Sequence, residues 1–113
     1  MPSQLLSIEV TRLDAGRARL GLTGDLDFDT APDLIAVAAD ARADGHHDLL
    51  IDLADVGLCD SSGLSAFVVL AGAGTVRLAG VGPQLQQLLD RTGLTELLAV
   101  ERPAVGDEAR EAG

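Results

Sequence analysis

Residues 49–64 read LLIDLADVGLCDSSGL, an apolar run that leads through a mixed segment to two adjacent serines. The nearly continuous apolar run over 49–53 predicts a central strand covered on both faces. We expect residues 54–59 to form a loop, after which Asp60-Ser61-Ser62-Gly63 opens a helix that extends to about Ala71. A buried strand that feeds a helix in this way is typical of α/β proteins.

The flanking segments continue the alternation of strands and helices. Alternating apolar and polar residues predict strands at 6–11 and 17–23, paired as an antiparallel hairpin. Thr30 or Asp29 can cap a helix that ends near Gly45. Three further elements are expected, namely a strand over 75–79, a helix from Gly82 to Gly93 and a last strand over 97–100.

One α/β domain over residues 1–100 accounts for all these elements. Its sheet is mostly parallel, with an N-terminal antiparallel hairpin strand and about three covering helices. Residues 101–113 form an acidic tail that we expect to be flexible. The predicted core includes Leu50, Ile51, Leu53, Val69, Val76 and Leu88.

Composition excludes several classes of function. The 113 residues carry 18 acidic and 8 basic side chains, and the net charge of −10 disfavours nucleic acids and anionic membranes as partners. All the basic residues are arginine, so a Schiff-base lysine and a P-loop lysine are both impossible. Phe28 and Phe67 are the only aromatic residues, too few to form a stacking platform for bases.

Cysteine content and hydropathy predict the compartment. With one cysteine, Cys59, the chain cannot form an internal disulfide framework or a cysteine-based zinc site. We expect Cys59 to be a small packing residue, since no basic neighbour in the sequence stabilises its thiolate. The longest apolar stretch, 64–74, is short of the ~20 residues of a membrane span, and residues 1–7 lack the pattern of a signal peptide. We therefore predict a cytoplasmic protein.

The start of the helix at Ser61 is the most informative candidate site. In open α/β sheets, ligands gather beyond the carboxyl ends of the strands, and a helix N-terminus favours an anion there. A phosphate on Ser61 would be tolerated at such a position. The alternative is that Asp60 and the serines only cap the helix.

Three segments together carry a family resemblance. Residues 55–64, DVGLCDSSGL, resemble the signature of STAS domains, specifically of the bacterial anti-sigma factor antagonists. The resemblance extends upstream to TGDLD at 23–27 and downstream to PQLQQLLDRTGL at 83–94, so that it covers nearly all of residues 5–100.

The resemblance implies a small α/β domain that binds an anti-sigma factor with serine kinase activity and so releases a sigma factor. In this family the kinase, which carries the ATP, inactivates its antagonist by phosphorylating the first serine of the tetrapeptide, here Ser61, and a phosphatase reverses the modification. Asp27 matches an acidic residue implicated in kinase docking. We expect Asp25, Asp60, Ser62 and Gly63 to complete the partner-binding environment.

Other interpretations have weaker support in the sequence. The triplet Asp25, Asp27 and Asp29 resembles the start of an EF-hand loop, but Thr30 and Ala36 stand where its turn glycine and bidentate glutamate are needed. A hydrolase triad of Ser61, His46 and an aspartate lacks the Gly-x-Ser-x-Gly elbow. We therefore predict no catalysis, no metal and no cofactor.

Two histidines and one rival function complete the sequence-based expectations. His46 and His47 are expected in a solvated turn at the opposite end of the central strand from Ser61. The rival function is a STAS module that docks constitutively, for example as a regulatory subunit of a transport complex.

Overall fold

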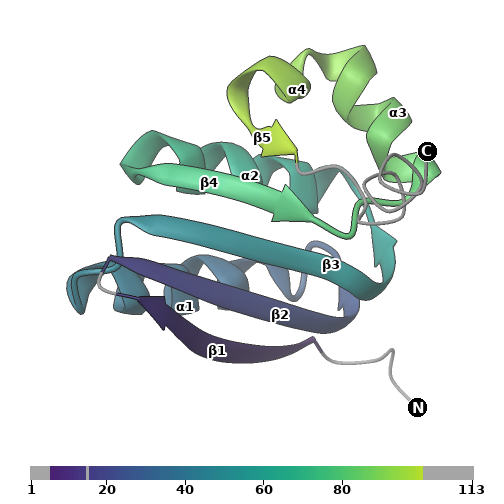
Figure 1. The fold of residues 1–113 in the computed structure, drawn as a ribbon. Helices are drawn as coiled ribbons and strands as arrows, with labels where there is room; N and C mark the ends of the chain where they lie inside the picture. Colours follow the sequence, from purple (N-terminus) through teal and green to yellow (C-terminus); the bar gives the residue numbers. More distant parts are fainter. Residues whose placement is uncertain (1–5, 15, 101–113) are drawn as a thin grey trace, which may run out of the picture.

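The computed structural model describes residues 6–14 and 16–100, which contain five strands and four helices (Figure 1). In chain order they are β1 (Ser7–Asp14), β2 (Arg17–Leu26), α1 (Ala31–Ala43), β3 (Asp48–Cys59), α2 (Ser61–Ala73), β4 (Thr75–Ala79), α3 (Pro83–Thr92), α4 (Leu94–Leu97) and β5 (Ala99–Val100). The predicted tail at 101–113 lies outside the described residues.

The strands form one sheet in the order β1-β2-β3-β4-β5. β1 pairs with β2 in the antiparallel direction, and every other neighbouring pair is parallel. The predicted fold class, a mostly parallel α/β sheet with an N-terminal antiparallel hairpin strand, is confirmed. Because parallel strands all end at the same edge, the loops after β2, β3 and β4 gather at one end of the domain.

The hydrophobic core lies on one face of this sheet, under α1 and α2 (Figure 1). Alternate residues of β2 and β3 point toward the helices, as the period of two in a strand requires. The largest fully buried side chains are Phe67, Leu20, Leu22, Leu26, Leu34, Leu49, Ile51, Leu78, Leu89 and Leu98.

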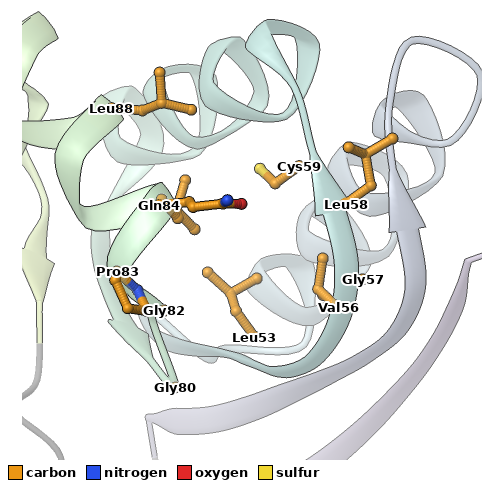
Figure 2. A pocket seen from close by; sticks show the side chains of 11 residues that line it. Leu53, Val56, Gly57, Leu58, Cys59, Gly80, Gly82, Pro83, Gln84 and Leu88 are labelled. Atoms are coloured by element: carbon orange, nitrogen blue, oxygen red, sulfur yellow. The ribbon is translucent and has the colours of Figure 1, made fainter.

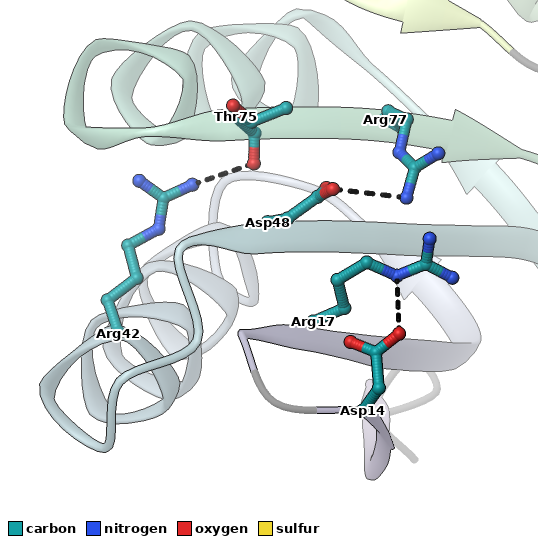
Figure 3. A network of polar contacts seen from close by, with 6 residues as sticks. All are labelled: Asp14, Arg17, Arg42, Asp48, Thr75 and Arg77. Atoms are coloured by element: carbon teal, nitrogen blue, oxygen red, sulfur yellow. Dashed lines mark hydrogen bonds and ion pairs between the residues drawn. The ribbon is translucent and has the colours of Figure 1, made fainter.

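The other face of the sheet carries ion pairs, so the expectation that the central strand is covered on both faces was wrong. Arg19 pairs with Asp52, and Arg77 pairs with Asp48 at 3.2 Å, as Figure 3 shows for the second pair. Burial tends to raise the pKa of Asp52, but hydrogen bonds from the Ala54 N–H and Arg19 outweigh it and hold that pKa below its ordinary value. Polar residues on this face of β3 therefore meet arginines of the flanking strands.

Several element boundaries differ from the expectation. The segment 54–59, expected as a loop, continues β3 because its backbone pairs with β2 as far as Leu26 opposite Cys59. α2 extends to Ala73 before Gly74 ends it. The predicted last strand at 97–100 is reduced to β5, since the short helix α4 occupies the residues before it.

Part of the predicted core is also corrected. Ile51, Leu53 and Val76 are buried as expected, whereas Leu50 and Leu88 are half-buried. The assignment of Val69 to the core was wrong, because this side chain is 54% exposed on the outer face of α2. The helix places Leu64, Ala66, Phe67 and Leu70 inward instead.

Ile51→Ala and Val69→Ala together test this one-sided core. Ile51→Ala removes fully buried methyl groups and should cost about 2–5 kcal/mol of unfolding free energy. Val69→Ala, at an exposed site, should change it by less than about 0.5 kcal/mol. Chemical denaturation of both variants measures the difference, and equal losses would contradict the placement of the core.

Candidate functional site

The loops after β2 and β3 are joined by the backbone. Leu26 pairs with Cys59 at the end of the two parallel strands, and the Asp60 N–H donates a hydrogen bond of 3.2 Å to the Leu26 carbonyl. The two candidate segments, 25–27 and 60–63, therefore lie side by side at the carboxyl end of the sheet. The predicted partner-binding environment contains residues of both segments, and the strand register brings the two segments together.

Asp60 caps α2 from an extended backbone conformation. Its Oδ1 accepts hydrogen bonds from the Ser62 N–H at 2.8 Å and the Gly63 N–H at 3.4 Å. Ser61, the first residue of the helix, is exposed, and Ser62 is half-buried. The carboxylate, rather than either serine, thus supplies the helix cap, and the hydroxyl of Ser61 stands at the surface.

Gly63 acts in packing. It is buried, and a Cβ on it would lie 2.7 Å from the Cys59 Sγ and 3.0 Å from the Leu26 Cδ2. Such distances are shorter than carbon and sulfur atoms tolerate, so the first turn of α2 can approach β2 and β3 only where residue 63 lacks a side chain. Gly63, predicted as part of the partner-binding environment, positions Ser61 from beneath.

Asp27 organises the loop between β2 and α1. Its Oδ1 accepts hydrogen bonds from the backbone N–H groups of Asp29 at 3.0 Å and Thr30 at 3.1 Å. Thr30 occupies the predicted capping position of α1 but uses its hydroxyl to donate to the Asp25 carbonyl at 2.8 Å. The side chains of Asp25 and Asp27 are both half-buried, and each carries its charge at the end of the sheet that holds Ser61.

A groove of about 430 Å³ opens beside this end, between β3 and the start of α3 (Figure 2). β4 pairs with β3 only as far as Asp52 opposite Ala79, after which the two strands separate. Leu53, Cys59 and Gln84 project toward the opening (Figure 2). The sequence held no sign of this groove, because it depends on where two distant strands part.

Cys59 lies half-buried on the wall of this groove. Burial, and secondly the charge of the neighbouring Asp60, raise the pKa of its thiol to about 11. The thiol therefore stays protonated at neutral pH, as expected for a packing residue rather than a redox switch.

His46 is buried at the far end of the molecule, so the expectation of a solvated position was wrong. Its backbone N–H donates to the Ala41 carbonyl at 3.1 Å, which folds the chain back onto α1. β3, with 12 residues, separates the two histidines from Ser61 by roughly 35 Å. The structure thus gives no support to a hydrolase triad of Ser61 with either histidine.

These features define a small α/β domain that presents one serine at a capped helix start. A family model described as "Mlab, STAS domain" matches residues 10–99. The chain therefore belongs to the STAS domain family. Within the described residues, no helix is long and apolar enough to cross a membrane.

Named relatives support the same family. An anti-sigma-B factor antagonist of Staphylococcus epidermidis is 36% identical over 101 residues, which cover 84% of this chain and 92% of that protein. Its Staphylococcus aureus counterpart is 33% identical over 106 residues, with the same two coverages of 84% and 92%. The crystal structure of an anti-sigma factor antagonist from Mycobacterium paratuberculosis matches with a TM-score of 0.77 at 25% identity, over 95% of this chain and 92% of that one.

A pair of glycine substitutions within α2 tests the packing at Ser61. Gly63→Ala forces the helix start away from Cys59 and Leu26, and should cost about 1–3 kcal/mol of unfolding free energy. Gly72→Ala meets no atom within 4 Å and should stabilise the helix by up to about 1 kcal/mol. Thermal unfolding of the two variants should therefore show shifts of opposite sign, and a stabilised Gly63→Ala would refute the close approach.

The raised pKa of Cys59 predicts slow alkylation. With a pKa of about 11 the native thiol is ionised at pH 7 roughly 100- to 300-fold less than an ordinary cysteine with a pKa of about 8.5 to 9. The rate of reaction with iodoacetamide should rise about tenfold for each pH unit until the pH approaches that value. Urea-denatured protein is the control, and native protein that reacts as fast at pH 7 would contradict the assignment.

Proposed function

We propose that this protein is an anti-sigma factor antagonist that binds an anti-sigma factor with serine kinase activity and thereby releases a sigma factor. Phosphorylation of Ser61 by that kinase switches the binding off, and a phosphatase restores it. The observation that carries the proposal is the exposed Ser61 at the start of α2, among aspartates. Relatives named anti-sigma-B factor antagonists, covered over 92% of their length, support it.

The helix start is suited to carry a phosphate without loss of the fold. The N-terminus of α2 is the positive end of the helix dipole, which favours an anion at Ser61. The Ser61 side chain lies at the surface, while the cap from Asp60 is made to the next two residues. A phosphorylated chain should therefore keep the architecture of the free protein.

Charge repulsion then explains how the modification releases the partner. Phosphorylation adds about −1.5 to −2 charges at pH 7, on a surface that already carries Asp25, Asp27 and Asp60. Like charges ~4 Å apart near a protein surface repel by about 4 kcal/mol per unit pair. Inverting a 99:1 bound population requires ~5.5 kcal/mol, so one partner carboxylate that faces the phosphate is sufficient.

The protein itself acts as a binding module in this scheme. The ATP, the kinase activity and the phosphatase activity all belong to partner proteins. The exchange of the anti-sigma factor between its partners takes place in the cytoplasm. Asp27 has two roles in this scheme. Its carboxylate holds the β2–α1 turn, and its charge lies at the same end of the sheet as Ser61. Asp27→Asn keeps an oxygen acceptor for that turn, so it would remove the charge with little effect on the fold.

Variants of the two adjacent serines test the switch. Ser61→Ala should bind the kinase as tightly as wild type and remain bound in the presence of ATP, whereas Ser61→Asp should bind more weakly. Ser62→Ala is the matched control, since its half-buried side chain lies one residue further into α2, and it should still be phosphorylated. Incubation with each anti-sigma factor kinase of the source bacterium and ATP, followed by peptide mapping, locates the phosphate.

Two results would overturn the proposal. Phosphate found on Ser62 or elsewhere, with Ser61 unmodified, would exclude the assigned position. Equal affinity for the kinase before and after modification of Ser61 would instead favour a module that docks constitutively.

A further inference from the structure

Phe28 is the most exposed large hydrophobic residue in the described part of the chain. Its side chain is 77% exposed, whereas the other phenylalanine, Phe67, is fully buried in the core. Phe28 lies two residues beyond the end of β2, in the turn that Asp27 holds by accepting a hydrogen bond from the Asp29 N–H. The hydrogen-bonded turn thus presents an aromatic ring to solvent, outside the hydrophobic core.

Leu58 is a second exposed apolar residue, on the neighbouring strand. It is 52% exposed and pairs with Asp25 in the register between β2 and β3. Phe28 lies two residues beyond Leu26, whose carbonyl binds the Asp60 N–H, and Ser61 is the next residue after Asp60. The register and this hydrogen bond therefore bring the three residues close together at the carboxyl ends of β2 and β3, within the span of an interface that buries about 800 Å² on each partner.

The charges in the two segments that carry these residues are all of one sign. Residues 23–33 carry Asp25, Asp27, Asp29 and Asp33, and residues 53–65 carry Asp55 and Asp60, with no basic residue in either segment. Arg17, Arg42 and Arg77 lie instead among acidic partners and carbonyls toward the other end of the strands (Figure 3). An apolar centre with an acidic rim is the complement of a basic surface with an apolar recess.

We propose that Phe28, flanked by Leu58, is the hydrophobic anchor of the docking surface and inserts into an apolar recess of the anti-sigma factor kinase, on a face that is basic opposite the aspartates and carries a carboxylate only opposite Ser61. This inference rests on the proposed function and adds the residue that supplies binding energy beside the switch. A second copy of this chain does not fit the surface, because the two acidic rims would repel. Large aromatic side chains at the centre of an interface commonly dominate its affinity.

The anchor and the rim have separable effects on binding. Loss of a buried anchor shortens the lifetime of a complex, so Phe28→Ala should raise the dissociation rate at least about tenfold. Rim charges steer the encounter, so neutralising them should lower the association rate and its dependence on salt. Asp29 and Asp33 suit this test because both are exposed.

The test of this surface is a measurement of binding kinetics at low and high salt. The purified chain is combined with each anti-sigma factor kinase of the source bacterium. The variants are Phe28→Ala and the double variant Asp29→Asn with Asp33→Asn. Leu13→Ala is the control for the first, since Leu13 is 41% exposed at the hairpin end of β1. Asp40→Asn, near the other end of α1, is the charge control for the second.

We expect only Phe28→Ala to raise the dissociation rate, and only the double variant to lower the salt-dependent association rate. The inference is wrong if Phe28→Ala binds the kinase as wild type does. It is also wrong if sedimentation shows that Phe28 mediates concentration-dependent dimers. In either case the proposed function at Ser61 stands. If Phe28→Ala loses binding but Ser61 is never modified, the switch is wrong and the surface stands. Wild-type protein that binds none of the kinases would overturn both.

Discussion

The parallel pairing of β2 with β3 beyond the end of β4 is the constraint on which the rest of the structure depends. It places Leu26 opposite Cys59 and brings the Asp60 N–H onto the Leu26 carbonyl. Gly63 then allows α2 to begin directly against both strands. Because these contacts are backbone hydrogen bonds and one close packing contact, the position of Ser61 is fixed by the fold itself. The same extension separates β3 from β4 and opens the groove next to α3.

Around that constraint, the polar groups of the site divide into those that hold the loops and those that face solvent. The carboxylate oxygens of Asp60 and Asp27 accept hydrogen bonds from backbone N–H groups of the helix start and of the turn. Ser61 and Phe28, each one residue further on, are left exposed. A rigid support for a displayed hydroxyl and a displayed ring is what a binding module needs, since a preordered surface loses little conformational entropy on association.

Charge is distributed unevenly along the strands. Toward their amino ends, arginines pair with aspartates on the open face of the sheet, as Arg77 does with Asp48. At the carboxyl ends the aspartates have no basic residue in their own segments. Six aspartates thus lie in the two segments that carry the proposed switch, so that a phosphate there adds to an existing negative field. The same field favours basic residues on the partner opposite these aspartates and disfavours self-association, while the partner carboxylate proposed opposite Ser61 accounts for release on phosphorylation.

The sequence alone determined the fold class, the family and the helix start at Ser61, because these follow from local patterns: alternation in strands, helix-start residues and a short motif. It was wrong about the inner face of α2, where Val69 points outward, and about the segment 54–59, which pairs instead of looping. Only the tertiary structure decided that Gly63 is a packing residue, that Cys59 is shielded, and that Phe28 stands exposed. Each of these depends on contacts between segments that are distant in sequence or on burial, and no local pattern encodes them.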